Sequence, residues 1–374
     1  RAVTQARVRR RSPSRGDSVG SVVVAGAWRA PAVTALASRR RGRSSTLMAA
    51  GTTVAASPAS WTFGVASSCC WRRNSRAWLS GASGYAFLIQ MMPDGDSAGP
   101  IGFTGLCVHG CTGEVASGSV VRLLQNAGCA SEAFCHCPFG GREGTMDWAR
   151  DEAWRLVRCS VDRGLPCIGF DVDGVDFAPI CGYDDQGYYV LRAEPGTTTS
   201  VPSGPVPWQS VGATIGWVRF ESVARCEPAP DDVAVRHGLQ AGYHRATHGK
   251  PMDGGAMGPA AFDLWAQSLE SGTIGSPGHR YCTAVYSELR RDAVAFLREA
   301  RGRLPGRADA LFAEALGHYE LVSERLNDVH ALHPFVDGAE TTLRCPEAAR
   351  LLRQAGAAER HGLSLRPAIA DALG

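Results

Sequence analysis

The sequence predicts an α+β protein in which an antiparallel sheet with helices is followed by an all-helical region. Short apolar runs separated by turn residues occupy positions 166–192, a pattern typical of antiparallel strands. After Pro228 these runs disappear, and long apolar periodicities of the helical type replace them. A chain of 374 residues exceeds the usual size of one hydrophobic core, so we expect two domains.

The composition is that of an ordinary globular protein, with 44% hydrophobic and 20% charged residues. The sequence contains no run of about 18 uncharged apolar residues, so we expect no transmembrane helix and no membrane partner. Thirteen cysteines without the dense spacing of a small secreted scaffold favour reduced, buried thiols. The expected location is therefore cytoplasmic.

Residues 1–55 are expected to form a disordered tail rich in Arg and Ser, because they cannot bury enough apolar surface to fold. Residues 1–50 hold eleven Arg and one acid, Asp17. This composition is also that of an organellar transit peptide, which would make the protein organellar. The alternative is a gene-model artefact, since the first Met is Met48. The rest of the chain has 28 basic and 35 acidic residues, which argues against nucleic-acid binding.

The first predicted domain comprises residues 56–226. Its expected elements before the sheet are a short helix at Trp61–Trp71, a strand at Tyr85–Gln90, and helices at Ser117–Asn126 and Thr145–Arg163. The expected strands of the sheet are Pro166–Asp171, Phe177–Tyr183, Gly187–Arg192 and Ile215–Phe220. The Pro- and Gly-containing stretch Glu194–Ser210 is expected to be a loop.

The second predicted domain, residues 227–374, is entirely helical. Pro and Gly between the periodic segments mark the helix ends. The expected helices are Asp231–Ala246, Ala260–Leu269, Tyr281–Arg301, Ala308–Ala331 and Pro346–Glu359.

Several motifs carry a resemblance to a known family. They are Pro166-Cys-Ile-Gly-Phe-Asp171, Ile180-Cys-Gly-Tyr-Asp-Asp-Gln-Gly-Tyr-Tyr-Val-Leu-Arg-Ala-Glu-Pro195, Gly258-Pro-Ala-Ala-Phe-Asp-Leu-Trp265 and Gly278-His-Arg-Tyr-Cys-Thr-Ala-Val-Tyr286. In order and spacing the chain resembles papain-like proteins of the bacteriocin-leader-peptidase-like group, more specifically the butirosin biosynthesis protein H N-terminal-domain family. The resemblance covers about residues 58–370. It implies a papain-like, cysteine-peptidase-type domain followed by a helical domain.

The resemblance also implies three catalytic positions. Papain-like chemistry needs a thiolate at the start of the first long helix, a His on the second strand, and an acid or amide that orients the His. In this chain the family positions fall at Ser60 or Trp61, at Asp176 and at Glu194. A set of Ser60, Asp176 and Glu194 has no neutral base with a pKa near 7, and neighbouring acids would repel an oxyanion. Peptide hydrolysis by the usual route is therefore not expected.

Three functions stay open at this point. The family resemblance implies acyl transfer to an amine from a carrier thioester, with a small molecule or acyl carrier as substrate. The alternatives are a pseudo-peptidase that binds a small molecule or peptide without catalysis, and a structural or interaction module. Whether the chain is an enzyme is thus undecided; an active form would be an acyltransferase or a cysteine-peptidase-like hydrolase.

Four further residues are candidates for ligand binding. The acids of Asp171-Val-Asp-Gly-Val-Asp176 could converge on a cationic substrate, while a calcium loop or a plain strand end are the alternatives. Asp184 belongs to the Gly-Tyr-Asp-Asp motif of the sheet. His279 and Tyr281 open a long helix whose free N–H groups could face a ligand, although a solvated helix start explains them equally.

A group of Cys and His residues offers further chemistry. Cys107-Val-His-Gly-Cys111, Cys129 and Cys135-His-Cys137 could bind a structural metal, but their spacings suit zinc only in part. Unligated thiols are the simpler interpretation, so we expect no metal and no cofactor. A relocated nucleophile, with Cys107 or Cys111 beside His109, is another alternative.

Overall fold

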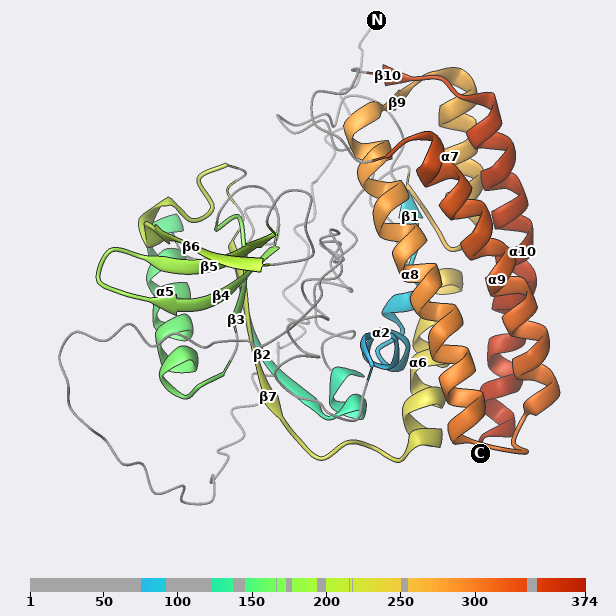
Figure 1. Ribbon diagram of the computed structural model, residues 1–374, viewed down its shortest axis with the longest axis horizontal. Coiled ribbons are helices and arrows are strands. Elements are labelled where there is room, and N and C mark those ends of the chain that lie inside the picture. Colours follow the sequence, from blue (N-terminus) through green and yellow to red (C-terminus); the bar gives the residue numbers. More distant parts are fainter. Residues whose placement is uncertain are drawn as a thin grey trace, which may run out of the picture. The chain divides into compact units, whose positions relative to one another are not determined.

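The computed structural model describes residues 75–91, 123–136, 145–165, 167–172, 177–193, 200–214, 216, 218–249, 255–334 and 342–374. Within these ranges the protein is α+β, with antiparallel sheets and a helical C-terminal part (Figure 1). The fold class is thereby confirmed at this level. The predicted tail at residues 1–55 and the predicted helix at Trp61–Trp71 lie outside the described residues. Among those that are described, no helix is long and apolar enough to cross a membrane.

Within the described ranges the main sheet has six strands in the order β2-β7-β3-β4-β5-β6, and every neighbouring pair is antiparallel. The strands are β2 (Cys129–His136), β3 (Cys167–Phe170), β4 (Phe177–Tyr183), β5 (Tyr188–Ala193), β6 (Ser200–Val206) and β7 (Val218–Arg225). The predicted strand at 177–183 has the observed bounds, and those at 166–171 and 187–192 match within one residue. The fourth predicted strand lies farther along the chain, in β7.

Two strands of the main sheet escaped prediction. Strand β6 lies in the stretch predicted to be a loop, because Pro202 and Pro205 are unusual in strands. Proline lacks the N–H that a strand with two neighbours must donate, but β6 is an edge strand with a single partner. Strand β2 was overlooked because its cysteines suggested metal or thiol chemistry.

One face of the sheet is covered by α5 (Met146–Asp162), as predicted (Figure 1). Thr145 caps the helix, since its side chain accepts a hydrogen bond from the Trp148 N–H at 3.2 Å. Val157 of α5 is fully buried in a core that includes Tyr188 and Phe220 of the sheet. The short helix η3 (Trp208–Ser210) adds Trp208, which stacks on Trp154 of α5.

The C-terminal part consists of five long helices. They are α6 (Asp231–His248), α7 (Pro259–Ser271), α8 (Ser276–Arg303), α9 (Asp309–Leu332) and α10 (Pro346–Ala372). All five were predicted, and α10 continues well beyond the expected end at residue 359. Two short pairs, β1 (Gln90–Met91) with β8 (Ala256–Met257) and β9 (Ile274–Gly275) with β10 (Thr342–Leu343), connect segments that are distant in sequence.

Before the sheet the local predictions are partly wrong. The strand predicted at Tyr85–Gln90 is instead mostly the 3-10 helix η1 (Tyr85–Phe87), and a strand forms only at Gln90–Met91. Of the helix predicted at Ser117–Asn126, the described end forms η2 (Leu124–Ala127). Gly128 ends it with a φ of 80°, a backbone conformation that favours glycine.

The helical core also contains α2 (Arg76–Ala82) and the residues up to Met91. Trp78 lies against Phe296, and Phe87 contacts Tyr319 edge-on at 5.3 Å between ring centres. The sequence assigned this stretch to the first domain. The predicted boundary near residue 227 stays a prediction, but the packing joins 76–91 to the helices that follow it.

Close approach of backbones explains why α2 fits there. A Cβ at Gly238 of α6 would lie 2.3 Å from the Gly81 carbonyl oxygen of α2. A Cβ at Gly81 would lie 2.0 Å from the ring of Phe296 on α8. Because no side chain fits at either position, the two glycines allow α2 to pack directly against α6 and α8.

Candidate functional site

The predicted catalytic residues Ser60, Asp176 and Glu194 lie outside the described residues. The strands next to two of them are described. Phe170 at the end of β3 pairs with Phe177 at the start of β4. Since β5 runs antiparallel to β4, its end at Ala193 lies at the same end of the sheet. Asp176 and Glu194 are the residues next to Phe177 and Ala193 in the sequence.

Asp171 follows β3 directly and is buried. Its carboxylate Oδ2 accepts a hydrogen bond from the Thr214 N–H at 3.1 Å, and its carbonyl accepts one from the Gly212 N–H at 3.2 Å. Its φ of 53° is unusual for a residue other than glycine. These contacts hold the segment before β7 against the end of β3. The remaining residues of the possible calcium loop, 173–176, lie outside the described residues.

Asp184 lies at the opposite end of β4, in the hairpin to β5. Its Oδ1 accepts hydrogen bonds from the N–H groups of Gln186 and Gly187, at 2.9 and 3.1 Å. Its Oδ2 accepts one from the Tyr189 hydroxyl at 2.7 Å. The bond from Tyr189, followed by the backbone bonds, lowers the pKa of Asp184. Asp184 therefore shapes a turn, and a strand's length separates it from Asp171.

His279 and Tyr281 lie in the first turns of α8, as expected. The His279 ring, however, faces the interior of the helical core and is completely buried. Its Nδ1 accepts a hydrogen bond from the Trp265 Nε1–H at 2.9 Å, and its Nε2 lies 3.0 Å from His333 Nδ1. Tyr281 is half-buried and packs against the same core. The four predicted binding residues thus lie in three places: Asp171 after β3, Asp184 in the β4–β5 hairpin, and His279 with Tyr281 at the start of α8.

Three of the described cysteines, Cys167, Cys181 and Cys282, are in surroundings opposite to those that activate a thiol. Burial raises the pKa of Cys167 to about 11, and it also raises the pKa values of Cys181 and Cys282. A nucleophilic cysteine needs a lowered pKa, which comes from positive charge and partial exposure. Cys107, His109, Cys111 and Cys137 lie outside the described residues, and only the strand position of Cys135 is described. Within the described part, no group of three or more His, Cys, Asp or Glu side chains could hold a metal ion.

A buried ion pair at the same sheet end was missed by sequence reasoning. Arg219 of β7 pairs in register with Phe170, and its Nε donates to Glu221 Oε1 at 2.8 Å. Both side chains are buried, on the sheet face opposite to that of Phe220, which packs toward α5. The alternating order Val218-Arg-Phe-Glu221 was the available signal for a strand with one polar face. The predicted strand ended one residue too early to reveal it.

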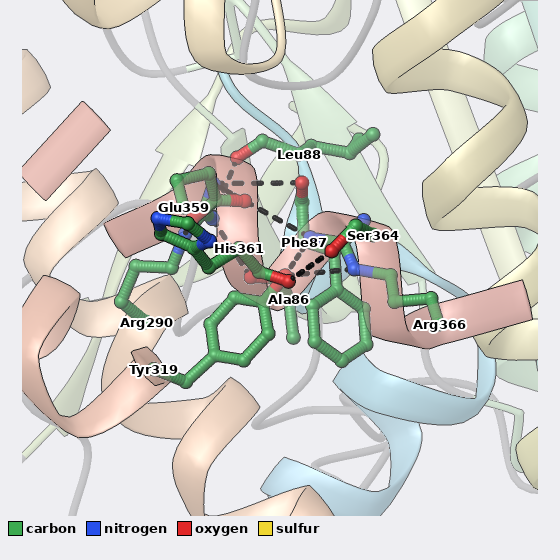
Figure 2. A network of polar contacts seen from close by, with 9 residues as sticks. All are labelled: Ala86, Phe87, Leu88, Arg290, Tyr319, Glu359, His361, Ser364 and Arg366. Atoms are coloured by element: carbon green, nitrogen blue, oxygen red, sulfur yellow. Dashed lines mark hydrogen bonds and ion pairs between the residues drawn. The ribbon is translucent and has the colours of Figure 1, made fainter. Parts of the chain in front are cut away.

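The helical core contains a larger polar network (Figure 2). Arg290 of α8 donates to the Ala86 and Leu88 carbonyls, both at 2.9 Å, and its Nε donates to Glu359 Oε2 at 2.9 Å. Arg366 donates to Glu359 Oε1 at 2.9 Å and to the Tyr319 hydroxyl at 2.7 Å. The exposed fraction of each of the four side chains of this network is at most 1%.

This network fastens the residues after α2 to the helices. Two guanidinium groups share one carboxylate, and the backbone carbonyls supply the remaining acceptors. Its groups are buried and bonded mainly to one another, which indicates a structural role. Positions this far apart in sequence gave no local signal.

The fold and these contacts define an α+β protein with an antiparallel sheet and a helical C-terminal part. No protein-family model matches the chain, and no curated protein matches it.

Proposed function

We propose that the protein is a papain-like acyltransferase of the butirosin type. It would transfer an acyl group from a carrier thioester to an amine at the sheet end where β3 and β5 end and β4 begins. The observation that supports this proposal is the strand arrangement. Adjacent antiparallel strands bring Phe177 and Ala193 to one end, and the family's two polar catalytic positions are next to these residues in the sequence, Asp176 before Phe177 and Glu194 after Ala193.

The acidic residues at these positions suit an amine acceptor. A carboxylate binds an ammonium group by charge and can accept its proton as the amine becomes the nucleophile. The amine nitrogen attacks the thioester carbonyl, the carbon–sulfur bond breaks, and the proton released by the nitrogen ends on the departing thiol. A thioester is already activated, so this reaction needs a weaker base than hydrolysis of an amide does.

A second candidate, ligand binding without catalysis, is favoured by the raised pKa values of the buried thiols Cys167, Cys181 and Cys282. In that case the same acids would hold a cationic small molecule or peptide. The two candidates differ in whether an amide product forms.

The test uses the full chain with an acyl thioester of N-acetylcysteamine as a carrier mimic and a panel of amines that includes an aminoglycoside. Mass spectrometry measures amide formation. We expect amide with at least one amine and a loss of at least tenfold in Asp176→Asn and Glu194→Gln. The matched control is Asp185→Asn, an exposed acid in the hairpin at the other end of the sheet.

Each other outcome rejects one interpretation. Release of free acid that does not depend on the amine would indicate a hydrolase. Amine binding by calorimetry without amide formation would leave only the binding candidate. Equal activity in all three variants would refute the assignment to this end of the sheet.

A further inference from the structure

Several hydrogen bonds hold the end of α9 against the start of α8. Strands β9 and β10, which precede α8 and α10, pair with each other. Arg280 Nη1 donates to the Pro334 carbonyl at 2.9 Å. The Thr283 hydroxyl lies 3.0 Å from His330 Nδ1 and 3.2 Å from the His333 carbonyl oxygen. We call the set Trp265, His279, Thr283, His330 and His333 the imidazole latch.

The hydrogen-bond chain of the latch fixes where the protons are. The Trp265 Nε1–H can only donate, so the Nδ1 of His279 that it contacts must carry no proton. The single ring proton of His279 is therefore on Nε2 and is donated to His333 Nδ1. A second proton on His279, at Nδ1, would point toward the Trp265 Nε1–H, with only 2.9 Å between the two nitrogens. The arrangement requires both rings to be neutral.

The surroundings also oppose a charge on these rings. His279 is completely buried and His333 is 8% exposed. Burial, then the charges of His333 and Arg280, lowers the pKa of His279 to about 3. Burial and Arg280 lower the pKa of His333, while burial and Arg291 lower that of His330. Besides the neighbouring imidazole, the charged groups that lower these pKa values are Arg280 and Arg291 on α8.

We infer that the imidazole latch is an acid-operated release, which holds the end of α9 on the start of α8 at neutral pH and opens in mild acid. When the contact opens, the rings regain water and titrate near their ordinary pKa of about 6.5. Protons then bind the open form and not the closed one, so the latch is fully effective above about pH 6.5 and weakens as pH falls toward 3. For His279 alone, the opening equilibrium increases roughly 25-fold from pH 7 to pH 5.

Hydrogen exchange of the full chain at pH 7 and pH 5, corrected for intrinsic exchange rates, measures this opening. Peptides from 276–283 and 326–334 report on the latch, and a peptide from 348–358 in the middle of α10 is the internal reference. We expect protection in the latch peptides to fall roughly 25-fold or more at pH 5, with a smaller change in α10. Equal loss of protection in all three peptides, or no loss in the latch, overturns the proposal.

Variants separate the imidazoles from other acid effects. In His279→Gln/His333→Asn the side chains keep donors and acceptors but cannot titrate, so the difference between pH 7 and pH 5 in the latch peptides should shrink to the part that His330 contributes. The control His361→Asn removes an exposed imidazole on α10 and should keep the wild-type response.

If the double variant does not fold, Trp265→Phe keeps the packing but removes the donor that holds His279 Nδ1 free of a proton. The pH at which the latch opens should then shift. An unchanged opening pH in Trp265→Phe contradicts the proposal as directly as an undiminished pH response in the double variant would.

Discussion

The sheet and the helical part solve the problem of burial in different ways. The core between α5 and the sheet is held by aromatic rings, with Trp154 against Tyr183, Tyr188 and Trp208. The helical core encloses charged and polar side chains, among them the Arg290–Glu359–Arg366 network and the imidazole latch. An apolar core tolerates substitutions that conserve volume, whereas removing one partner of a buried polar network leaves the others buried without a hydrogen bond. We therefore expect the helical part to be the more sensitive to single polar substitutions.

The largest expected effect is that of Glu359→Ala, which leaves Arg290 and Arg366 without their carboxylate. Breaking a buried ion pair costs about 3–5 kcal/mol in the free energy of unfolding. Glu221→Ala, in the sheet, leaves a single guanidinium, that of Arg219, without its partner. Its loss of unfolding free energy should therefore be smaller. Urea unfolding of both variants measures the two losses of unfolding free energy.

The control for this pair is Glu320→Ala, whose exposed partner is Arg298. It should change the unfolding free energy by at most about 1 kcal/mol. A larger loss for Glu221→Ala than for Glu359→Ala would reverse the comparison between the two regions.

A smaller loss is expected at the contact between α2 and α6. In Gly238→Ala the new Cβ would overlap the backbone of Gly81 and Ala82, and overpacking of this kind costs about 1–3 kcal/mol. Gly317→Ala, in the middle of α9, meets open space and should instead stabilise the protein by up to about 1 kcal/mol. Thermal unfolding of the two variants should therefore shift in opposite directions; shifts in the same direction would contradict the close contact.

The helix N-caps allow a comparison of two substitutions that each change the unfolding free energy by about 1 kcal/mol. Thr145 caps α5 beside the sheet, and Ser75 caps α2 in the helical part. Thr145→Ala should cost about 1 kcal/mol. Ser75→Ala should cost more, because the Ser75 hydroxyl also donates to Glu299 at 2.7 Å. Urea unfolding distinguishes the two, and equal losses would mean that the contact to Glu299 contributes nothing.

The smallest expected effect is a gain. Asp292 and Glu288 of α8 share Arg76, and burial raises the pKa of Asp292 despite that partner. A carboxyl group whose pKa is raised in the folded state favours folding in acid, where it is protonated. This contribution to stability is lost as pH rises through the folded-state pKa. Asp292→Asn should therefore be slightly more stable than the wild type at pH 7, with the advantage shrinking in acid. Urea midpoints at pH 7 and pH 4 test this; a less stable variant at pH 7 would show that the pair with Arg76 prevails.

Local chemistry explains which elements could be predicted. Thr145 ahead of an amphipathic run, the turn Asp184–Gly187 between two apolar runs, and Pro346 at the start of α10 each act within a few residues. The failures have physical causes too. Strand β6 was hidden by its prolines, and Tyr85–Gln90 looked extended because its apolar residues contact helices on several sides instead of a sheet.

The sequence by itself determined where most of the helices and strands form, since periodicity, caps and turns depend on neighbours along the chain. Only the tertiary structure decided that Arg290 would hold the Ala86 carbonyl, that Glu359 would serve two guanidiniums, and that His279 would face His333. These partners are separated by many residues in most cases, and nothing in the local pattern specifies them. The reason is that burial removes water as a hydrogen-bond partner, so each enclosed polar group must find whichever group the packing of helices brings beside it.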